Sequence, residues 1–99
     1  MTESSTRDLG ILSHLDALLA TVGPVGGLRV LDIGCGEGQM ARALAERGAR
    51  VTGLDASAYF LDMARRDATE RGLAVNFIQG ICAVLNGPMH VSAGCLIEH

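Results

Sequence analysis

The stretch that decides the fold runs from Val30 to Gly38, VLDIGCGEG, where a short apolar run leads directly into a glycine-rich turn. A helical pattern begins at Gln39, immediately after the turn. A buried strand, a glycine turn and a helix in this order place bare backbone N–H groups beside a helix N-terminus, where a ligand with negative charge or hydrogen-bond acceptors can bind. The next apolar run ends in an acidic residue, Asp55. Together these features predict a nucleotide-like ligand.

The spacing of the glycines argues against a nicotinamide or flavin dinucleotide as the ligand. Gly34, Gly36 and Gly38 follow the pattern G-x-G-x-G. The fingerprint of nicotinamide and flavin dinucleotides is G-x-G-x-x-G, which would place its third glycine at position 39, where this chain has Gln39. Glycine suits such a turn because it adopts positive φ and lets a ligand approach the backbone.

Asp55 is a candidate ligand for a ribose. A carboxylate at the end of the second strand lies beside the glycine turn in this topology and can accept hydrogen bonds from both ribose hydroxyls. It would repel a ribose that carries a 2′-phosphate. The structural alternative is that Asp55 simply caps the helix that follows it.

Strand and helix patterns alternate along the chain, which predicts an α/β fold. Apolar runs predict strands at 28–33, 51–54 and 74–78. Helical periodicity predicts helices from Arg7 to Val22, from Gln39 to about residue 47, and from 58 to about 71. The expected buried positions of the three helices are Ile11, Leu12, Leu15, Leu18, Leu19 and Val22; Met40, Ala43, Leu44 and Arg47; and Phe60, Met63, Ala64 and Ala68. With right-handed crossovers, this is one half of a Rossmann-like, doubly wound parallel sheet.

Bulk properties exclude several classes of protein. The chain has 99 residues, enough for one small domain, and a net charge of −3, which argues against a nucleic-acid partner. The N-terminus does not resemble a signal peptide, and no apolar run is long enough to span a membrane. Cys35, Cys82 and Cys95 fit neither a zinc pattern nor a closed disulfide framework, so a reducing cytoplasm is the simplest compartment.

The two stretches 31–38 and 50–57, LDIGCGEG and RVTGLDAS, resemble the class I S-adenosylmethionine-dependent methyltransferases. The resemblance covers about residues 28–80. It implies that S-adenosyl-L-methionine is the cofactor, that Asp32 helps to hold its methionine amino group, and that Asp55 binds its ribose hydroxyls.

The same resemblance assigns the remaining cofactor-binding positions. Gly34 and Gly36 would give the cofactor close approach to the backbone, and Ala56 and Ser57 would lie against the adenine. The predicted cofactor-binding residues also include Cys35 and Gly38, which belong to the same turn. Cys35 is interpreted as a packing residue, although a thiol near a helix N-terminus can have a lowered pKa and become reactive.

The chain departs from the family after Gly80. The family usually carries an acidic residue there to read the adenine amino group, whereas this chain has Ile81 and Cys82. Residues 81–97 contain no charged residue and no clear helical period, which predicts an irregular apolar tail. We therefore divide the chain into the N-terminal half of a cofactor-binding domain, 1–80, and an atypical tail, 81–99.

The resemblance implies a methyltransferase for a small-molecule acceptor, but one that is truncated to its cofactor-binding half. The strands that carry the substrate pocket and any general base in the family have no counterpart in 99 residues, so no catalytic residue is assigned. Two alternatives remain: a dinucleotide-binding Rossmann half, and a non-catalytic fragment or interaction module. The first strand is central in the full fold, so here its free edge would favour self-association unless the tail or a partner covers it.

Overall fold

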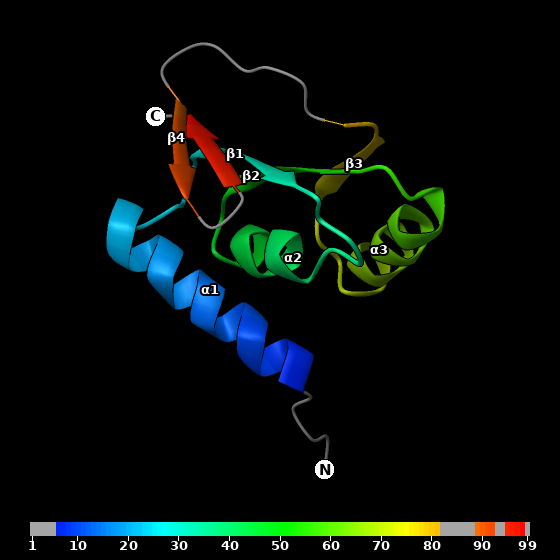
Figure 1. The fold of residues 1–99 in the computed structure, drawn as a ribbon, viewed down its shortest axis with the longest axis horizontal. Coiled ribbons are helices and arrows are strands. Elements are labelled where there is room, and N and C mark those ends of the chain that lie inside the picture. The colour runs from blue at the N-terminus through cyan, green and yellow to red at the C-terminus, as the bar shows by residue number, and fades with distance from the viewer. Residues whose placement is uncertain (1–5, 82–88, 93–94, 99) are drawn as a thin grey trace.

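The chain folds into one sheet with three helices (Figure 1). This computed structural model describes the backbone of residues 6–81, 89–92 and 95–98. Its elements, in chain order, are α1 (Thr6–Val22), β1 (Arg29–Ile33), α2 (Gln39–Glu46), β2 (Arg50–Asp55), α3 (Ala58–Glu70), β3 (Val75–Gln79), β4 (Met89–Ser92) and β5 (Cys95–Glu98). Among these residues, no helix is both long and apolar enough to cross a membrane.

The sheet has the strand order β3-β2-β1-β5-β4. Strands β1, β2 and β3 are parallel, and Val30 lies beside Val51, which lies beside Val75. The alternation of strands and helices predicted this arrangement, and the structure confirms it. The glycine turn after β1 and Asp55 at the end of β2 therefore come to the same edge of the sheet.

The tail differs from the prediction. Where an irregular segment was expected, β4 and β5 form an antiparallel pair, and β5 pairs antiparallel with β1 so that Ile97 lies beside Val30 and Cys95 beside Asp32. Cys95 and Ile97 are both fully buried. The edge of β1 that would be free without the tail is covered by β5, which is one of the two ways of covering it that the sequence analysis allowed. Two strands of four residues each are too short for a helical period, and the two buried residues of β5, Cys95 and Ile97, are two positions apart, as residues on one face of a strand are. The turn signal at 86–88 lies outside the described residues.

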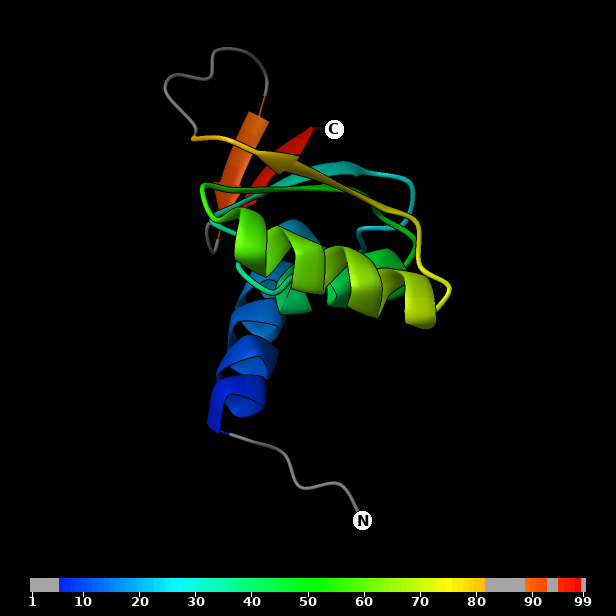
Figure 2. The ribbon, with the colours of Figure 1, turned by 90° about the vertical axis from the view of Figure 1, so that its right-hand side faces the viewer.

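All three helices lie on one face of the sheet (Figure 2). Helices α2 and α3 pack against the strands, and α1 packs against α2. The core between these layers is aliphatic; its largest fully buried side chains are Leu15, Leu18, Leu44, Leu61 and Ile97. The strands contribute alternate residues to this core because successive side chains of a strand point to opposite faces.

Two of the expected core positions, Arg47 and Phe60, are exposed. In α2 the buried arginine is Arg42, whereas Arg47 is exposed. In α3, Leu61 is fully buried and Phe60 is 39% exposed. Ser57 caps α3 as predicted, since its side chain accepts a hydrogen bond from the backbone N–H of Phe60 at 3.2 Å.

The docking of the β4–β5 pair can be tested with two isoleucines that differ only in burial. Ile97→Ala removes a fully buried side chain beside β1 and is expected to lower the free energy of unfolding by about 3 kcal/mol. Ile81→Ala removes a side chain that is 82% exposed and is expected to cost less than about 0.5 kcal/mol. Urea unfolding of both variants measures the difference. Equal, small effects would show that β5 is not docked on the sheet.

Candidate functional site

The turn between β1 and α2 is built from glycines in a left-handed conformation. Gly34, Gly36 and Gly38 have φ angles of 69°, 56° and 84°. Residues with a Cβ are strained at such angles, so the alternation of glycines allows the chain to reverse within five residues and enter α2.

The three glycines differ in what surrounds them. A Cβ added to Gly34 or Gly36 would meet no other atom within 4 Å. A Cβ on Gly38 would lie 3.0 Å from Cβ of Ala64 and 3.1 Å from Cζ of Phe77. The space beside the first two glycines is thus open to a ligand, while Gly38 lies against the core. Its part in ligand binding stays a prediction.

The backbone N–H groups of the turn are not bare. The N–H groups of Gly34 and Cys35 donate to the carbonyl oxygen of Leu54 at 2.7 and 3.0 Å, and Gly38 N–H donates to the Cys35 carbonyl at 2.9 Å. Gly36 N–H donates to the Asp55 carboxylate at 2.8 Å. The expectation that this turn offers free amides is therefore wrong for these four residues. Their donors instead hold the turn in shape.

The carboxylate of Asp55 joins two loops. Its Oδ2 accepts the hydrogen bond from Gly36 N–H, and its Oδ1 accepts one from Ser57 N–H at 2.9 Å. The side chain is half-buried. Each carboxylate oxygen has two acceptor positions, so each retains one for a ligand. The residue that caps α3 is Ser57, and Asp55 is thereby available for the turn and for a ligand.

The end of β3 supports the Asp55 loop from the other side. Gln79 Nε2 donates to the carbonyl oxygen of Ala56 at 3.1 Å, and Gly80 N–H donates to the carbonyl oxygen of Asp55 at 3.0 Å. Gln79 has no local signal in the sequence, because only the parallel pairing of β2 with β3 brings it beside Ala56. Ile81, which follows, is 82% exposed.

Asp32 is a buried carboxyl group with one free oxygen. Its side chain is 5% exposed, and its Oδ1 accepts a weak hydrogen bond from the Cys95 thiol at 3.6 Å. No described residue donates to Oδ2. Burial raises the pKa of Asp32 from 3.8 to about 6, an effect that the thiol opposes and the nearby charge of Asp55 reinforces. An unpaired buried carboxylate oxygen is costly, and a donor from a ligand would relieve it.

Cys35 is a packing residue. Burial, followed by the charges of Asp32 and Asp55, raises the pKa of its thiol to about 12, which disfavours a reactive thiolate at neutral pH. A Cβ on Gly53 would lie 2.9 Å from the Cys35 sulfur and 2.8 Å from Cδ1 of Phe77. Gly53 is therefore required for this packing. The sequence signal for this contact is a glycine inside a predicted strand, because such a glycine often marks a place where another group lies close to the backbone.

Arg42 contacts both the glycine turn, through Glu37, and α3, through Asp67. Its guanidinium is buried, donates from Nη1 to the carbonyl oxygen of Glu37 at 2.6 Å, and lies 3.7 Å from the carboxylate of Asp67. Burial lowers the pKa of Arg42, and the nearby Asp67 opposes that shift. Sequence reasoning assigned the buried arginine of this helix to Arg47 and missed Arg42, whose burial depends on the acceptors that Glu37 and Asp67 provide.

Comparison with known proteins gives consistent results. The family described as "Methyltransferase domain" matches residues 30–94. The ubiquinone biosynthesis O-methyltransferase of Pectobacterium carotovorum subsp. carotovorum is 53% identical over 53 residues, which are 54% of this chain and 22% of that protein.

Two solved structures share the fold. Coclaurine N-methyltransferase, bound to N-methylheliamine and SAH, is 25% identical with a TM-score of 0.66 and matches 81% of this chain and 25% of its own. The [4+2]-cyclase SpnF is 30% identical with a TM-score of 0.70 and matches 91% of this chain and 34% of its own. The chain therefore spans about a fifth to a third of the length of these proteins.

The burial of Asp32 predicts a pH dependence of stability. Its folded-state pKa lies above its ordinary value, so the folded chain retains a proton that the unfolded chain releases, and this group lowers the free energy of unfolding as the pH rises from about 4 to about 6. Asp32→Asn removes the effect. From about pH 4.5 to about pH 7.5, we expect the variant to gain about 2 kcal/mol relative to the parent chain.

Urea unfolding at both pH values measures this gain. The exposed carboxylate of α1 provides the control, because Asp16→Asn should show no such difference. A pH-independent effect of Asp32→Asn would contradict the assigned burial.

Substitutions of Arg42 in α2 and of Arg47 at its C-cap test whether the Arg42 contact stabilises the glycine turn. Arg42→Met keeps an apolar stem but removes the donor to Glu37, and is expected to lower the free energy of unfolding by about 1 to 3 kcal/mol. Arg47→Met removes an exposed guanidinium and should change it by less than about 0.5 kcal/mol. Thermal or urea unfolding compares them, and equal effects would show that the contact to Glu37 is unimportant.

Proposed function

Because this chain belongs to the class I S-adenosylmethionine-dependent methyltransferase family, we propose that its glycine turn and Asp55 loop bind S-adenosyl-L-methionine for methyl transfer to a small-molecule acceptor. The observation that carries the proposal is the position of the Asp55 carboxylate. It accepts one hydrogen bond from Gly36 N–H of the glycine turn and one from Ser57 N–H of its own loop. Each of its two oxygens keeps one further acceptor position for a ligand. Two neighbouring acceptors suit the two hydroxyls of a ribose.

The rest of the site fits the other parts of the cofactor. The unpaired Oδ2 of Asp32 is an acceptor for the methionine amino group, and the open space beside Gly34 and Gly36 admits the methionine chain. Ala56 and Ser57 are assigned to the adenine, next to the ribose-binding carboxylate. Cys35 and Gly38 contribute by giving the turn its shape.

When bound, the cofactor would supply a methyl group on a positively charged sulfur; the acceptor would attack the methyl carbon in line, and the sulfur would leave with the carbon–sulfur electron pair as a neutral thioether. This chain's residues orient the cofactor for that displacement, which is the main contribution a protein makes to such a reaction. We assign no general base.

We propose a functional boundary near residue 80. Residues 1–80 form the cofactor-binding half, and residues 81–99 form a segment that closes the edge of β1. The change of strand direction supports this division, since β1, β2 and β3 are parallel whereas β4 and β5 are antiparallel. We place the protein in a reducing cytoplasm, which the free thiols of Cys35 and Cys95 support.

Calorimetric titration of the chain with S-adenosylmethionine, S-adenosylhomocysteine and NAD tests the proposal. We expect saturable binding of the first two. Asp55→Asn removes a negative acceptor and should weaken both by about 10- to 100-fold, because hydrogen bonds to charged groups are worth about 1.5 to 3 kcal/mol.

The control is Asp62→Asn, an exposed carboxylate on α3 that should leave affinity unchanged. Binding of NAD alone would instead indicate a dinucleotide-binding module. A folded chain that binds none of the three would indicate a non-catalytic interaction module.

A further inference from the structure

Cys95 of β5 and Asp32 of β1 form a buried contact that links the C-terminal segment to the proposed cofactor site. The two residues are partners in the antiparallel register of β1 and β5, in which Ile97 is the partner of Val30. Cys95 is fully buried, and Asp32 is 5% exposed. A slip of one residue would turn both Cys95 and Ile97 to the other face of the sheet. The register that buries Ile97 therefore also brings the thiol to the carboxyl group.

The thiol of Cys95 is the donor in this contact. Its sulfur lies 3.6 Å from Oδ1 of Asp32. Burial, followed by the charge of Asp32 and the hydrogen bond to it, raises the pKa of the thiol to about 12, so the group keeps its proton at neutral pH. A thiol is a weak, neutral donor. The contact therefore occupies one carboxylate oxygen and leaves the negative charge of Asp32 in place.

The second oxygen of Asp32 points to a ligand. Oδ2 is buried, and no described residue donates a hydrogen bond to it. Buried polar atoms are nearly always hydrogen-bonded, because an unpaired one costs free energy. Two residues further along the chain, Gly34 has open space beside its Cα, so a donor can approach from the glycine turn.

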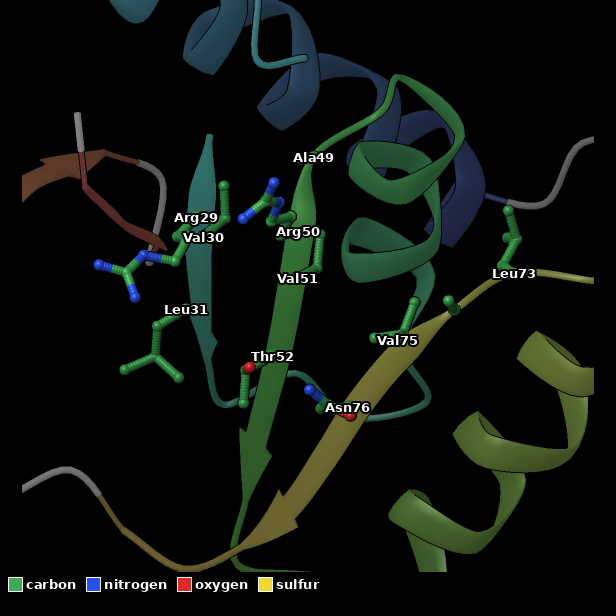
Figure 3. A pocket seen from close by; sticks show the side chains of 11 residues that line it. Arg29, Val30, Leu31, Ala49, Arg50, Val51, Thr52, Leu73, Val75 and Asn76 are labelled. Carbon is green, nitrogen blue, oxygen red and sulfur yellow. The ribbon is translucent and has the colours of Figure 1, made fainter. Parts of the chain in front are cut away.

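The cavity at the other end of the sheet does not serve this oxygen. That cavity, of about 790 Å³, lies at the amino ends of β1, β2 and β3, and its lining on β1 is Arg29, Val30 and Leu31 (Figure 3). Asp32 is not part of the lining. It lies nearer the carboxyl end of β1, where the charge of Asp55 acts on it. The unpaired oxygen is thus on the side of the proposed cofactor site.

We propose that Cys95 is a positioning residue for the cofactor: its thiol holds Oδ1 of Asp32 and leaves Oδ2 as a charged acceptor for the amino group of S-adenosylmethionine. This inference rests on the proposed function. An aliphatic side chain at position 95 would leave both oxygens of Asp32 unpaired, and a cationic one would neutralise the charge that attracts an ammonium group. The segment after residue 80 thereby contributes a residue to the site.

The contact also sets the pH range in which Asp32 is charged. Burial raises the pKa of Asp32, the hydrogen bond from Cys95 lowers it, and the charge of Asp55 on β2 raises it. Of the other titratable groups nearby, Cys35 of the turn is a neutral thiol, and Arg42 of α2 is directed to the turn and α3. Removal of the Cys95 thiol therefore raises the pKa of Asp32 further, so binding of an ammonium group requires a higher pH.

The experiment compares two ligands by calorimetric titration of the full chain at about pH 6 and about pH 8. S-adenosylhomocysteine carries the amino group, whereas 5′-methylthioadenosine has the same nucleoside and a thioether but no amino or carboxyl group. Cys95→Ala should weaken binding of S-adenosylhomocysteine by about three- to tenfold at the lower pH and by less at the higher pH. It should leave binding of 5′-methylthioadenosine unchanged.

Ile97→Val is the matched control, because it removes buried atoms from the same face of β5 at the residue opposite Val30. It should change neither the ratio of the two affinities nor their pH dependence. Carbon-13 NMR titration of the Asp32 carboxyl group needs no ligand, and its pKa should be higher in Cys95→Ala than in the parent chain or in Ile97→Val. Cys95→Ser keeps a donor and should bind S-adenosylhomocysteine as the parent does, which keeps the test valid if Cys95→Ala does not fold by circular dichroism.

Several results would overturn the proposal. Equal weakening of both ligands by Cys95→Ala, or the same loss in Ile97→Val, would show that Cys95 acts only through the stability of β5. An unchanged pKa of Asp32 in Cys95→Ala would show that the thiol does not hold the carboxyl group. If the parent chain binds S-adenosylhomocysteine and Cys95→Ala binds it equally well at the lower pH, only the role of Cys95 fails. If the parent chain does not bind it, the proposed function fails, and the role of Cys95 fails with it.

Discussion

The arrangement of the site depends on how the end of β2 holds the turn that follows β1. The Asp55 carboxylate accepts from the N–H groups of Gly36 and Ser57, and the Leu54 carbonyl accepts from Gly34 and Cys35. A turn with three glycines has more freedom in the unfolded chain than a turn of the same length without them, and ordering it costs free energy. These four hydrogen bonds offset that cost. The same carboxylate that shapes the turn is the one that we assign to the ribose of the cofactor.

Local patterns in the sequence were sufficient for much of this architecture. Apolar runs, helical periods and turn glycines predicted the strands and helices, because these features are set by neighbours within a few residues. The proximity of Asp55 to the turn followed from the alternation of strands and helices, which makes β1 and β2 parallel. Other features depend on contacts between distant segments. Neither the pairing of Cys95 with Asp32 nor the contact of Gln79 with Ala56 has a local signal. The buried Arg42 was missed because its burial is acceptable only with the acceptor that Glu37 provides.

The two ends of the parallel strands have different chemistry. The carboxyl ends hold acidic groups and open glycines, which suit a ligand with hydroxyl and amino donors. The amino ends hold two arginines above an apolar sheet. A fold alone does not determine a reaction, and the similarity to both a methyltransferase and a cyclase illustrates this. The proposed function therefore depends on the Asp55 and Asp32 carboxylates.

The most direct test of the account is a two-dimensional ¹H–¹⁵N NMR titration of the chain with S-adenosylhomocysteine. The amides of Gly36 and Ser57 both donate to the carboxylate that we assign to the ribose, so a ligand on that carboxylate must change their environment. The account predicts saturable shifts of these two amides and their neighbours in the turn and the Asp55 loop, with no shifts at Arg29 or Arg50. Shifts confined to the arginine end of the sheet, or no shifts in a chain with a dispersed, folded spectrum, would contradict it.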